Sequence, residues 1–506
     1  MRSIHWASEL AVLALRYADR VAIIDAQGEA TYARVFAKAA GIGRALTAMG
    51  VRGGDTVATV FRNGADAASA SYGVMMSGAV ETPLNPVLGV ADFRHCLDVS
   101  RARVIITSAD LAEGLAGAGP AVLSADEAGE VALNPADFPS VAPAAPARIV
   151  FTSGTTGPPK GAVHTQEGRW TANLLLQASL PHRPGPGSRV LLMTPFAHGS
   201  SLMTFAYLAS GASVALLDGV HAPSVLGMIE RGECDEMFAP PTVLAKIVAA
   251  AEGRRLPSLR TIFCGTAVLT PALYDRAKAI FGPVVRITYG KSEVFNPITV
   301  MEAQETDGWY GEAGEGACVG WPAAGVELAI RAEDGALVPR GEVGEVLIRA
   351  RHLMAGYQTI GGFEPMAPDE FHDTGDLGYL DDRGRLRLVG RAADMIKSGG
   401  YKVAPDEVER ALAAALQPSE VAVVGIPSEY WGEVILAAVE RPAEGWKARA
   451  EAVIETMTAY KRPRLLVAYD ELPRNGIGKI RRAAIRADIL SRYRLTQGPK
   501  PQLVSH

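Results

Sequence analysis

The sequence predicts an α/β protein that has a large N-terminal domain of wound parallel sheets, a β-rich subdomain, and a small α+β domain at the C-terminus. Three observations lead to this prediction. The chain has 506 residues, which exceeds the roughly 100 to 200 residues of one domain. Helical and extended patterns alternate over its N-terminal and middle parts, which is typical of parallel sheets wrapped by helices. Between residues 321 and 389 the pattern changes to short alternating strands with glycine-rich turns.

The N-terminal part opens with a helix, a strand and a second helix. Residues 8–17 have a helical pattern and residues 21–25 an extended one. Residues 31–49 are again helical, with Thr31 as the N-cap and Gly50 as the stop. The other strands predicted in the N-terminal and middle parts are short and apolar: residues 56–60, 104–108, 189–193, 213–217 and 260–264.

A second pattern begins after Arg391. Helices are predicted over residues 405–416 and 447–460, and strands over residues 421–426, 434–439 and 465–469. A unit of about 110 residues is large enough to fold by itself. The helix expected over residues 481–494 is rich in arginine and is interpreted as an amphipathic, solvated helix.

The composition argues against several classes of function. Hydrophobic residues make up 48% of the chain, charged residues 21%, and the formal net charge is −5, so no broad basic face for nucleic acid is expected. The four cysteines are far apart, which indicates reduced core thiols rather than disulfides or a zinc site. Charges interrupt the apolar residues of positions 1–25, so neither a signal peptide nor a membrane span is expected. The sequence therefore predicts a soluble, cytoplasmic protein.

The most informative segment is residues 149–161, where hydroxyls, glycines and a lysine directly follow an apolar strand (IVFTSGTTGPPKG). Glycines let backbone N–H groups approach an anion, and the hydroxyls of Ser153, Thr155 and Thr156 can donate to phosphate oxygens. Lys160 adds a mobile positive charge. The spacing differs from a P-loop, because two prolines separate the last loop glycine from the lysine and no hydroxyl follows it. The segment predicts a binding loop for a nucleotide triphosphate.

Four further clusters carry chemistry that a nucleotide-activating enzyme needs. Residues 289–293 (YGKSE) place an aromatic ring, a hydroxyl and the carboxylate of Glu293 at a strand end, and this carboxylate can hold Mg²⁺. Residues 371–376 (FHDTGD) end in Asp376, which is expected on a tight turn where it can accept both hydroxyls of a ribose. The other two clusters combine glycines with basic residues: 390–402 (GRAADMIKSGGYK) and 472–480 (LPRNGIGKI).

Together and in this order, these motifs resemble the adenylate-forming superfamily of acyl- and aryl-CoA synthetases, peptide-synthetase adenylation domains and firefly-type luciferases. The resemblance covers essentially the whole chain. Further agreement comes from residues 83–86 (PLNP), 195–198 (PFAH), 263–267 (FCGTA), 354–357 (MAGY) and 460–463 (YKRP). The resemblance implies an AMP-binding, or adenylation, domain over residues 1–391 and a mobile C-terminal domain over residues 392–506.

The resemblance also implies a role for individual residues. The loop residues that would bind the β and γ phosphates of ATP are Thr152, Ser153, Gly154, Thr155, Thr156, Gly157 and Lys160. The adenine would be flanked by Gly265, Thr266, Ala267, Tyr289 and Gly290. The other nucleotide contacts would be Ser292 for the α phosphate, Glu293 for Mg²⁺, and Asp376 and Arg391 for the ribose. Lys479 would be the catalytic lysine of adenylation.

The implied first step explains why these cations are needed. A carboxylate must attack a polyanion, and two unit charges about 4 Å apart repel by roughly 4 kcal/mol at an effective dielectric of about 20. Mg²⁺ on Glu293 and the ammonium of Lys479 would neutralise the charge that develops at phosphorus, while the loop orients pyrophosphate as leaving group. The product would be an acyl adenylate, which a thiol can then attack.

In the second step, the resemblance implies that the C-terminal domain rotates about a hinge near Ala393, where the family usually carries Asp or Lys. Lys479 would then leave, and the loop containing Ser398, Gly399 and Gly400 would replace it. Small residues are tolerated at hinges, so the rotation is expected to survive. Glycines suit a narrow passage for the pantetheine arm of coenzyme A, because a side chain would block close approach of the backbone.

The acid substrate is less well specified. If the family's pocket positions carry over, the pocket is lined by His198, Pro240, Cys264, Gly265, Lys291, Val294 and Phe295, with His198 as a catalytic residue at an aromatic gate. Lys291 is unusual, because relatives mostly carry an uncharged residue there. It can face a second acidic group on the substrate, pair with Glu293 or Glu302, or point outward, and an inorganic oxyanion such as nitrite is a further alternative.

The expected acceptor is coenzyme A, because the chain is free-standing and its Ser-Gly-Gly loop resembles that of aryl- and short-acyl-CoA ligases. Transfer to a separate acyl-carrier protein is the alternative within enzymes. A catalytically silent nucleotide-binding regulator would lack Lys479, Glu293 or Asp376, and all three are present. The predicted partners are therefore ATP, Mg²⁺, a small carboxylic or related oxyacid and coenzyme A, and a homodimer is compatible with the sequence.

Overall fold

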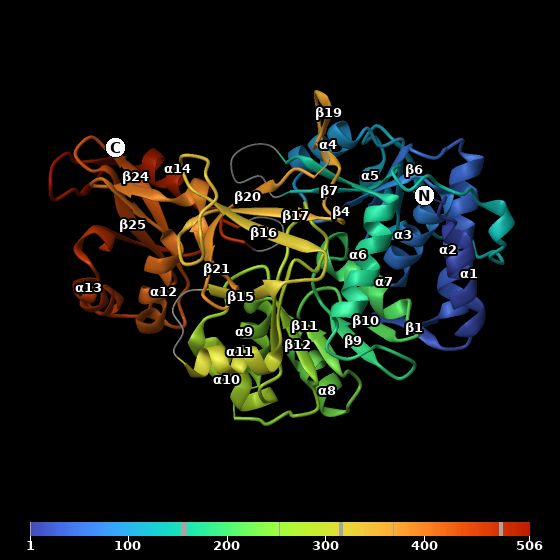
Figure 1. Cartoon of the computed structure of the whole chain (residues 1–506), viewed down its shortest axis with the longest axis horizontal. Helices are drawn as coiled ribbons and strands as arrows, with labels where there is room; N and C mark the ends of the chain where they lie inside the picture. The colour runs from blue at the N-terminus through green and yellow to red at the C-terminus, as the bar shows by residue number, and fades with distance from the viewer. Residues whose placement is uncertain (1, 153–158, 252, 313–316, 368, 475–478) are drawn as a thin grey trace. The chain divides into compact units, whose positions relative to one another are not determined.

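The computed structural model describes residues 2–152, 159–251, 253–312, 317–367, 369–474 and 479–506. The chain divides into two compact units, which are described separately (Figure 1). Unit 1 contains Met1–Ala313, Val319–Glu327 and Arg349–Glu370, and unit 2 contains Gly314–Cys318, Leu328–Ile348 and Phe371–His506. The predicted domain division at residue 391 stays a prediction.

Unit 1 contains two large sheets. The first has the strand order β19 (Gly362–Pro365), β18 (Gly356–Thr359), β8 (Gly161–Thr165), β7 (Pro146–Phe151), β4 (Val80–Leu84), β3 (Thr56–Val60), β5 (Val104–Thr107) and β6 (Ala121–Ser124). The strands from β7 to β6 are parallel, whereas β8, β18 and β19 continue the sheet through antiparallel pairs.

The second sheet is also mainly parallel. Its strands in unit 1 have the order β14 (Thr299–Met301), β13 (Val285–Tyr289), β12 (Thr261–Cys264), β11 (Glu236–Phe238), β9 (Arg189–Leu192), β10 (Ser213–Leu216), β1 (Val21–Asp25) and β2 (Gly28–Thr31). The strands from β13 to β1 are parallel, and β2 and β14 pair antiparallel at the two ends of this series. The end of β15 (Ala317–Pro322) pairs with β14.

Helices cover both faces of the second sheet (Figure 1). Val190 and Leu192 of β9 face a core shared with the first sheet, whereas Leu191 and Met193 face a second core. The shared core includes α1 (Trp6–Arg16), α2 (Tyr32–Ala48), α3 (Ala65–Ser77), α6 (Gln166–Ser179) and α7 (Ser201–Leu208), and the second core α8 (Ala222–Glu230), α9 (Pro241–Ala250) and α10 (Pro271–Phe281). The remaining helices of unit 1 are α4 (Val90–Ser100), α5 (Ala109–Leu115) and α11 (Ala303–Gly311).

Unit 2 combines a β-rich part with an α+β part. The β-rich part has the strand order β16 (Val326–Arg331), β17 (Gly344–Ala350), β20 (His372–Leu380) and β21 (Leu386–Arg391). The α+β part has the order β23 (Tyr401–Val403), β22 (Ile396–Ser398), β25 (Gly432–Glu440) and β24 (Val421–Ser428), with β26 (Leu465–Tyr469) parallel to β25. Its helices are α12 (Pro405–Leu416), α13 (Trp446–Thr456) and α14 (Arg482–Arg492), and β27 (Tyr493–Leu495) pairs with β28 (Leu503–Ser505).

Many local predictions are confirmed. Strands β1, β3 and β26 and helix α12 have the predicted bounds. The side chain of Thr31 caps α2 by accepting a hydrogen bond from the Arg34 N–H at 3.3 Å, and Gly50 follows with a left-handed φ of +77°. Helix α13 ends four residues earlier than predicted, at Thr456, because Met457 is extended. None of the helices in the described parts of the chain is long and apolar enough to cross a membrane.

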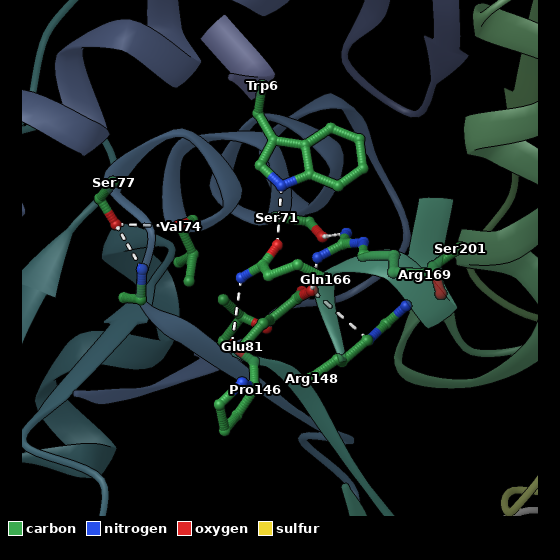
Figure 2. A network of polar contacts seen from close by, with 12 residues as sticks. Trp6, Ser71, Val74, Ser77, Glu81, Pro146, Arg148, Gln166, Arg169 and Ser201 are labelled. Atoms are coloured by element: carbon green, nitrogen blue, oxygen red, sulfur yellow. Dashed lines mark hydrogen bonds and ion pairs between the residues drawn. The ribbon is translucent and has the colours of Figure 1, made fainter. Parts of the chain in front are cut away.

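A buried ion network that the sequence did not predict lies in the first sheet (Figure 2). Glu81 of β4 is 3.4 Å from the guanidinium of Arg148 on β7 and 3.4 Å from that of Arg169 on α6. All three side chains are buried. Burial opposes ionisation of Glu81, but the two guanidinium charges outweigh it and lower the pKa of this carboxyl. Glu81 therefore ties β7 and α6 to the centre of the sheet.

We expect Glu81→Gln to destabilise unit 1 strongly, because two buried guanidinium groups would then face a neutral amide. Breaking a buried ion pair from one side typically costs about 3 to 5 kcal/mol. Urea denaturation of the full chain measures the loss in the free energy of unfolding.

Glu130→Gln provides the matched control. Glu130 pairs with Arg34 at 3.1 Å, and both side chains are well exposed to solvent. Losing this surface pair should cost less than about 1 kcal/mol. Similar small losses in both variants would contradict a stabilising role for the Glu81 network.

Candidate active site

The two ends of the predicted phosphate loop are held together by the antiparallel pair β7–β8. Phe151 is paired with Gly161, and the Thr152 N–H donates to the Lys160 carbonyl at 3.0 Å. The loop therefore leaves from the end of an apolar strand, as predicted. Five residues predicted to bind phosphate lie outside the described residues: Ser153, Gly154, Thr155, Thr156 and Gly157.

Lys160 and Glu293, which were predicted separately, are linked by Tyr357 of β18. The Tyr357 hydroxyl donates to Glu293 Oε1 at 3.1 Å. The Lys160 ammonium lies 5.4 Å from the centre of the Tyr357 ring and 3.9 Å from the carboxylate of Glu364. Burial, together with the charge of Glu293 and the hydrogen bond to it, raises the pKa of Tyr357, so its hydroxyl remains a donor at neutral pH.

The segments predicted to flank the adenine leave from the same edge of the second sheet. Strands β12 and β13 are parallel neighbours, so Gly265 and Tyr289 lie at their carboxyl ends, where α/β sheets commonly bind ligands. A Cβ on Gly265 would lie 2.6 Å from the Thr288 carbonyl, so only glycine fits there. Thr266 is exposed and has a left-handed φ of +70°, which is rare for a β-branched residue and is typical of strained functional sites. Ala267 and Gly290 continue these two segments.

The backbone around Glu293 is fixed from two sides. His164 Nε2 donates to the Ser292 carbonyl at 2.8 Å, and the Met354 N–H donates to the Glu293 carbonyl at 2.9 Å. Burial lowers the pKa of His164 to about 3, so this imidazole is neutral. Its ring stacks on Phe295, with 3.6 Å between the ring centroids. These contacts give Ser292 and Glu293 defined positions after β13.

The predicted substrate residues have different environments. Val294 and Phe295 are buried, and Phe295 packs in a cluster with Val150 and Ala172. Pro240 is buried as the N-cap of α9, and burial raises the pKa of the Cys264 thiol to about 12. Lys291 is partly buried at the start of the irregular segment after β13, so each of the three alternatives given for its side chain stays open. Their pocket-lining roles stay predictions.

His198 lies in the π-helical segment η2 (Phe196–Ser200), where its φ of −117° and ψ of −136° depart from helical values. The hydroxyl of Ser201 donates to the His198 carbonyl at 2.8 Å, which fixes the backbone at the junction with α7. A π-helical segment beside a helix is frequent at functional sites. The predicted gate role of His198 remains a prediction.

The two predicted ribose ligands lie together in unit 2. Asp376 on β20 is directly opposite Arg391 on β21, and the Arg391 Nε is 2.8 Å from Asp376 Oδ1. Asp376 was expected on a tight turn but lies within a strand. The turn-like feature is just before it, where Gly375 has a φ of +67° and its N–H donates to Asp373 Oδ1 at 2.8 Å.

Gly399 and Gly400 form the two-residue turn of the β22–β23 hairpin, rather than a loop between a strand and a helix. Their φ values are +58° and +84°, as a type I′ turn requires. A Cβ on Gly400 would meet no atom within 4 Å, whereas one on Gly399 would lie 3.1 Å from the Trp431 ring. Two adjacent glycines between short extended segments could have predicted this hairpin from the sequence. Ala393 lies in the short 3₁₀ helix Ala392–Asp394, and its hinge role stays a prediction.

Lys479 is exposed and directly follows residues outside the described part of the chain. Arg474 and Ile480 form an isolated β-bridge, which brings the two sides of the lysine loop together. Arg474 is anchored in turn by Glu420 at 2.7 Å and Glu440 at 2.8 Å. Backbone pairing therefore joins the described residues at the two ends of this loop, as it does at the ends of the phosphate loop.

The sequence did not predict the network around Arg482 at the start of α14. Its guanidinium is 2.9 Å from Asp394 and 2.8 Å from Glu409, and it also pairs with Asp406. Burial opposes the charge of Arg482, but the acidic partners outweigh it and raise the pKa of the guanidinium. Helix α14 is amphipathic as predicted, and Ile485 and Ile489 lie on its buried face. Arg482 is separated from these partners by more than one helix and strand, so no local pattern could identify them.

Among the described residues, no group of three or more His, Cys, Asp or Glu side chains could hold a metal ion. Glu293 is a single carboxylate with one oxygen already hydrogen bonded. This donor set fits Mg²⁺, which proteins commonly bind through one or two carboxylates together with substrate phosphates.

Comparisons with known proteins agree over almost the full chain. The model for the AMP-binding enzyme family matches residues 10–358, and that for the AMP-binding enzyme C-terminal domain matches residues 407–479. The chain is 30% identical over 502 residues to the sulfoacetate–CoA ligase of Cupriavidus necator, covering 94% of this chain and 96% of that protein. It is 31% identical over 475 residues to the feruloyl-CoA synthase of an Amycolatopsis species, covering 90% and 93%.

A solved structure shows the same fold. The o-succinylbenzoate coenzyme A synthetase of Bacillus subtilis, in complex with ATP and magnesium ion, superposes with a TM-score of 0.82 at 26% identity, covering 95% of this chain and 98% of that one. The motifs, the fold and the similarity to CoA ligases agree. The chain therefore belongs to the AMP-binding enzyme family, that is, to the adenylate-forming superfamily of acyl- and aryl-CoA synthetase type.

Proposed function

We propose that this chain is an ATP-dependent acid:CoA ligase. It forms an acyl or aryl adenylate and pyrophosphate, and then transfers the acyl group to coenzyme A. The observation that carries this proposal is the similarity to a CoA ligase over 94% of the chain. The paired Asp376 and Arg391 and the linked Lys160 and Glu293 support it, because these four side chains are those assigned to the nucleotide.

The nucleotide is bound by groups of complementary chemistry. Thr152, Lys160 and the loop between them bind the β and γ phosphates, and Ser292 contacts the α phosphate. The Gly265 and Tyr289 segments flank the adenine. Asp376 accepts hydrogen bonds from the ribose hydroxyls, and its pair with Arg391 orients the carboxylate. Mg²⁺ bound by Glu293 supplies positive charge at the phosphates.

Lys479 brings the acid and the nucleotide together in the first step. The acid carboxylate attacks the α phosphorus, its oxygen forms the new P–O bond, and pyrophosphate leaves with the bonding electrons of the cleaved P–O bond. An ammonium between the two anions offsets their repulsion and the charge that develops at phosphorus. Lys479 is exposed beside the bridge between Arg474 and Ile480, which suits a group that approaches a bound substrate.

In the second step the coenzyme A thiolate attacks the acyl carbon, and AMP leaves. The Gly399–Gly400 turn is proposed to line the path of the pantetheine arm. A Cβ on Gly400 would extend into open space, so any larger side chain would occupy volume that is now empty.

The acid is proposed to carry a second acidic or strongly polar group. This proposal is based on Lys291, a cation at a position that faces the acid in related enzymes. The curated relatives include ligases named for sulfoacetate and 2-succinylbenzoate, which carry two acidic groups, and for indoleacetate, which carries one. They therefore allow both classes of acid, and Lys291 favours the first.

Pyrophosphate release from a panel of acids, with and without coenzyme A, tests the proposed function. Some acid should give pyrophosphate and, when coenzyme A is present, a thioester and AMP. Adenylate formation without thioester would favour transfer to a carrier protein. Release with nitrite but no carboxylic acid would favour an oxyanion substrate, and no release with any acid would overturn the proposal.

Lys479→Ala should slow adenylation alone. Loss of a contact to charge that develops in the transition state typically lowers the rate by a factor of about 100 to 1,000, or roughly 3 to 4 kcal/mol. A presynthesised acyl adenylate should still be converted to thioester by the variant. Stopped-flow traces of the two half-reactions provide the measurement, and equal losses in both would contradict a role in the first step only.

Gly400→Leu should retain pyrophosphate exchange and abolish thioester formation. Because the φ of Gly400 is +84°, strain must be separated from blockage, and Gly400→Asn serves as the control. Asparagine tolerates left-handed backbone and is smaller than leucine, so this variant should retain more thioester formation. Loss of exchange in both variants would show that the hairpin supports the nucleotide site or the fold.

Lys291→Met should reduce kcat/KM for the natural diacid by a factor of at least about ten, because a charge pair that becomes buried when the acid binds contributes several kcal/mol. The relative rate with plain aliphatic or aromatic acids should rise. Mono- and dicarboxylic acids, hydroxyaromatic acids and inorganic oxyacids are compared on the wild type and the variant. A uniform loss across all acids would show that Lys291 supports Glu293 or ATP instead.

A further inference from the structure

Tyr357 occupies a central place between two groups assigned to the nucleotide. Strand β18 lies between β8 and β19, and Tyr357 is paired with Ala162 on one side and with Glu364 on the other. Lys160 is only two residues before Ala162. The order of the three strands therefore places Lys160, Tyr357 and Glu364 next to one another, which explains the contacts among their side chains.

The hydroxyl and the ring of Tyr357 serve different partners. The hydroxyl donates to Glu293 Oε1 at 3.1 Å, whereas the ring is 5.4 Å from the Lys160 ammonium. The backbone of Glu293 is already held by the Met354 N–H and by the bridge between Val294 and Leu353. The hydrogen bond to Oε1 therefore fixes the remaining freedom of the carboxylate, its rotation about the side-chain bonds.

The free oxygen of that carboxylate is the one suited to a cation. In the described part of the chain, Glu293 Oε2 makes no hydrogen bond or ion pair, while Oε1 accepts from Tyr357. A metal-binding carboxylate that is hydrogen bonded through its other oxygen keeps a single orientation, and loss of such an outer partner typically weakens metal binding 10- to 100-fold.

We propose that Tyr357 is a positioning residue, which orients Glu293 for the Mg²⁺ of the bound nucleotide and holds Lys160 against its ring before the nucleotide binds. This inference rests on the proposed function. In the sequence, Tyr357 was only part of the motif at residues 354–357, which added to the resemblance to the family. The inference gives this side chain a task of its own. The hydroxyl group of Tyr357 serves Glu293 and its aromatic ring serves Lys160, so the two tasks can be removed separately.

Tyr357→Phe removes the hydroxyl and keeps the ring. Mn²⁺ is used as the spectroscopic probe, and its binding to the full chain with a non-hydrolysable ATP analogue is measured by electron paramagnetic resonance. The dissociation constant for Mn²⁺ should rise about tenfold or more. Unchanged Mn²⁺ affinity in this variant would overturn the proposal.

Tyr274→Phe is the matched control. The Tyr274 hydroxyl also donates to a carboxylate, that of Asp307, at 2.6 Å, but this pair links α10 to α11 and has no role in the proposed site. The control should bind Mn²⁺ with wild-type affinity. A similar weakening in both variants would indicate a general loss of structure and would count against a positioning role.

The double variant Glu293→Gln with Tyr357→Phe tests whether the hydroxyl acts through Glu293. If it does, Tyr357→Phe should have no further effect on Mn²⁺ binding in the Glu293→Gln background, and an additive loss would overturn the proposal. These binding measurements need no turnover. If the wild type releases pyrophosphate with none of the acids, the proposed function is rejected. The Mn²⁺ data still decide the role of Tyr357 in that case.

Discussion

The buried carboxylate of Glu81 is the interaction on which the geometry of the proposed phosphate site depends. Arg148 lies on the strand that leads into the phosphate loop, and Arg169 lies on the helix that follows the next strand. One carboxylate thus fixes the elements on both sides of the loop. A loop that must approach a polyanion closely cannot contribute much to its own stability, so rigid flanks are needed, and here buried charge supplies part of that rigidity.

The sequence predicted those features that depend on neighbouring residues. The cap at Thr31, the stop at Gly50 and the strand before the phosphate loop are local, and the structure confirms them. The family was identified because several motifs occur in one order, and the comparisons confirm it. The hairpin at Gly399 and Gly400 was also local, but its two adjacent glycines were interpreted through the resemblance instead of through their backbone preference.

The sequence could not predict which residues far apart in the chain pair with one another. Tyr357 and Glu293 are 64 residues apart, and Arg482 and Asp394 are 88 residues apart, so no periodic pattern links them. Charges inside apolar strands, such as Glu81 and Arg148, are a signal that could have indicated buried partners, because an unpaired buried charge is too costly. Which partners they would be depended on the strand order, and a parallel sheet does not reveal that order in its sequence.

The backbone of Thr266 has a consequence for engineering. A β-branched residue at a φ of +70° costs stability that glycine or asparagine would not, yet the chain keeps threonine at this exposed strand end. A screen of variants that selects only for thermal resistance would therefore favour replacement of Thr266. If the strain serves nucleotide binding, such selection would yield more thermostable proteins with weaker activity. A screen of variants of this protein should therefore measure turnover together with thermal stability.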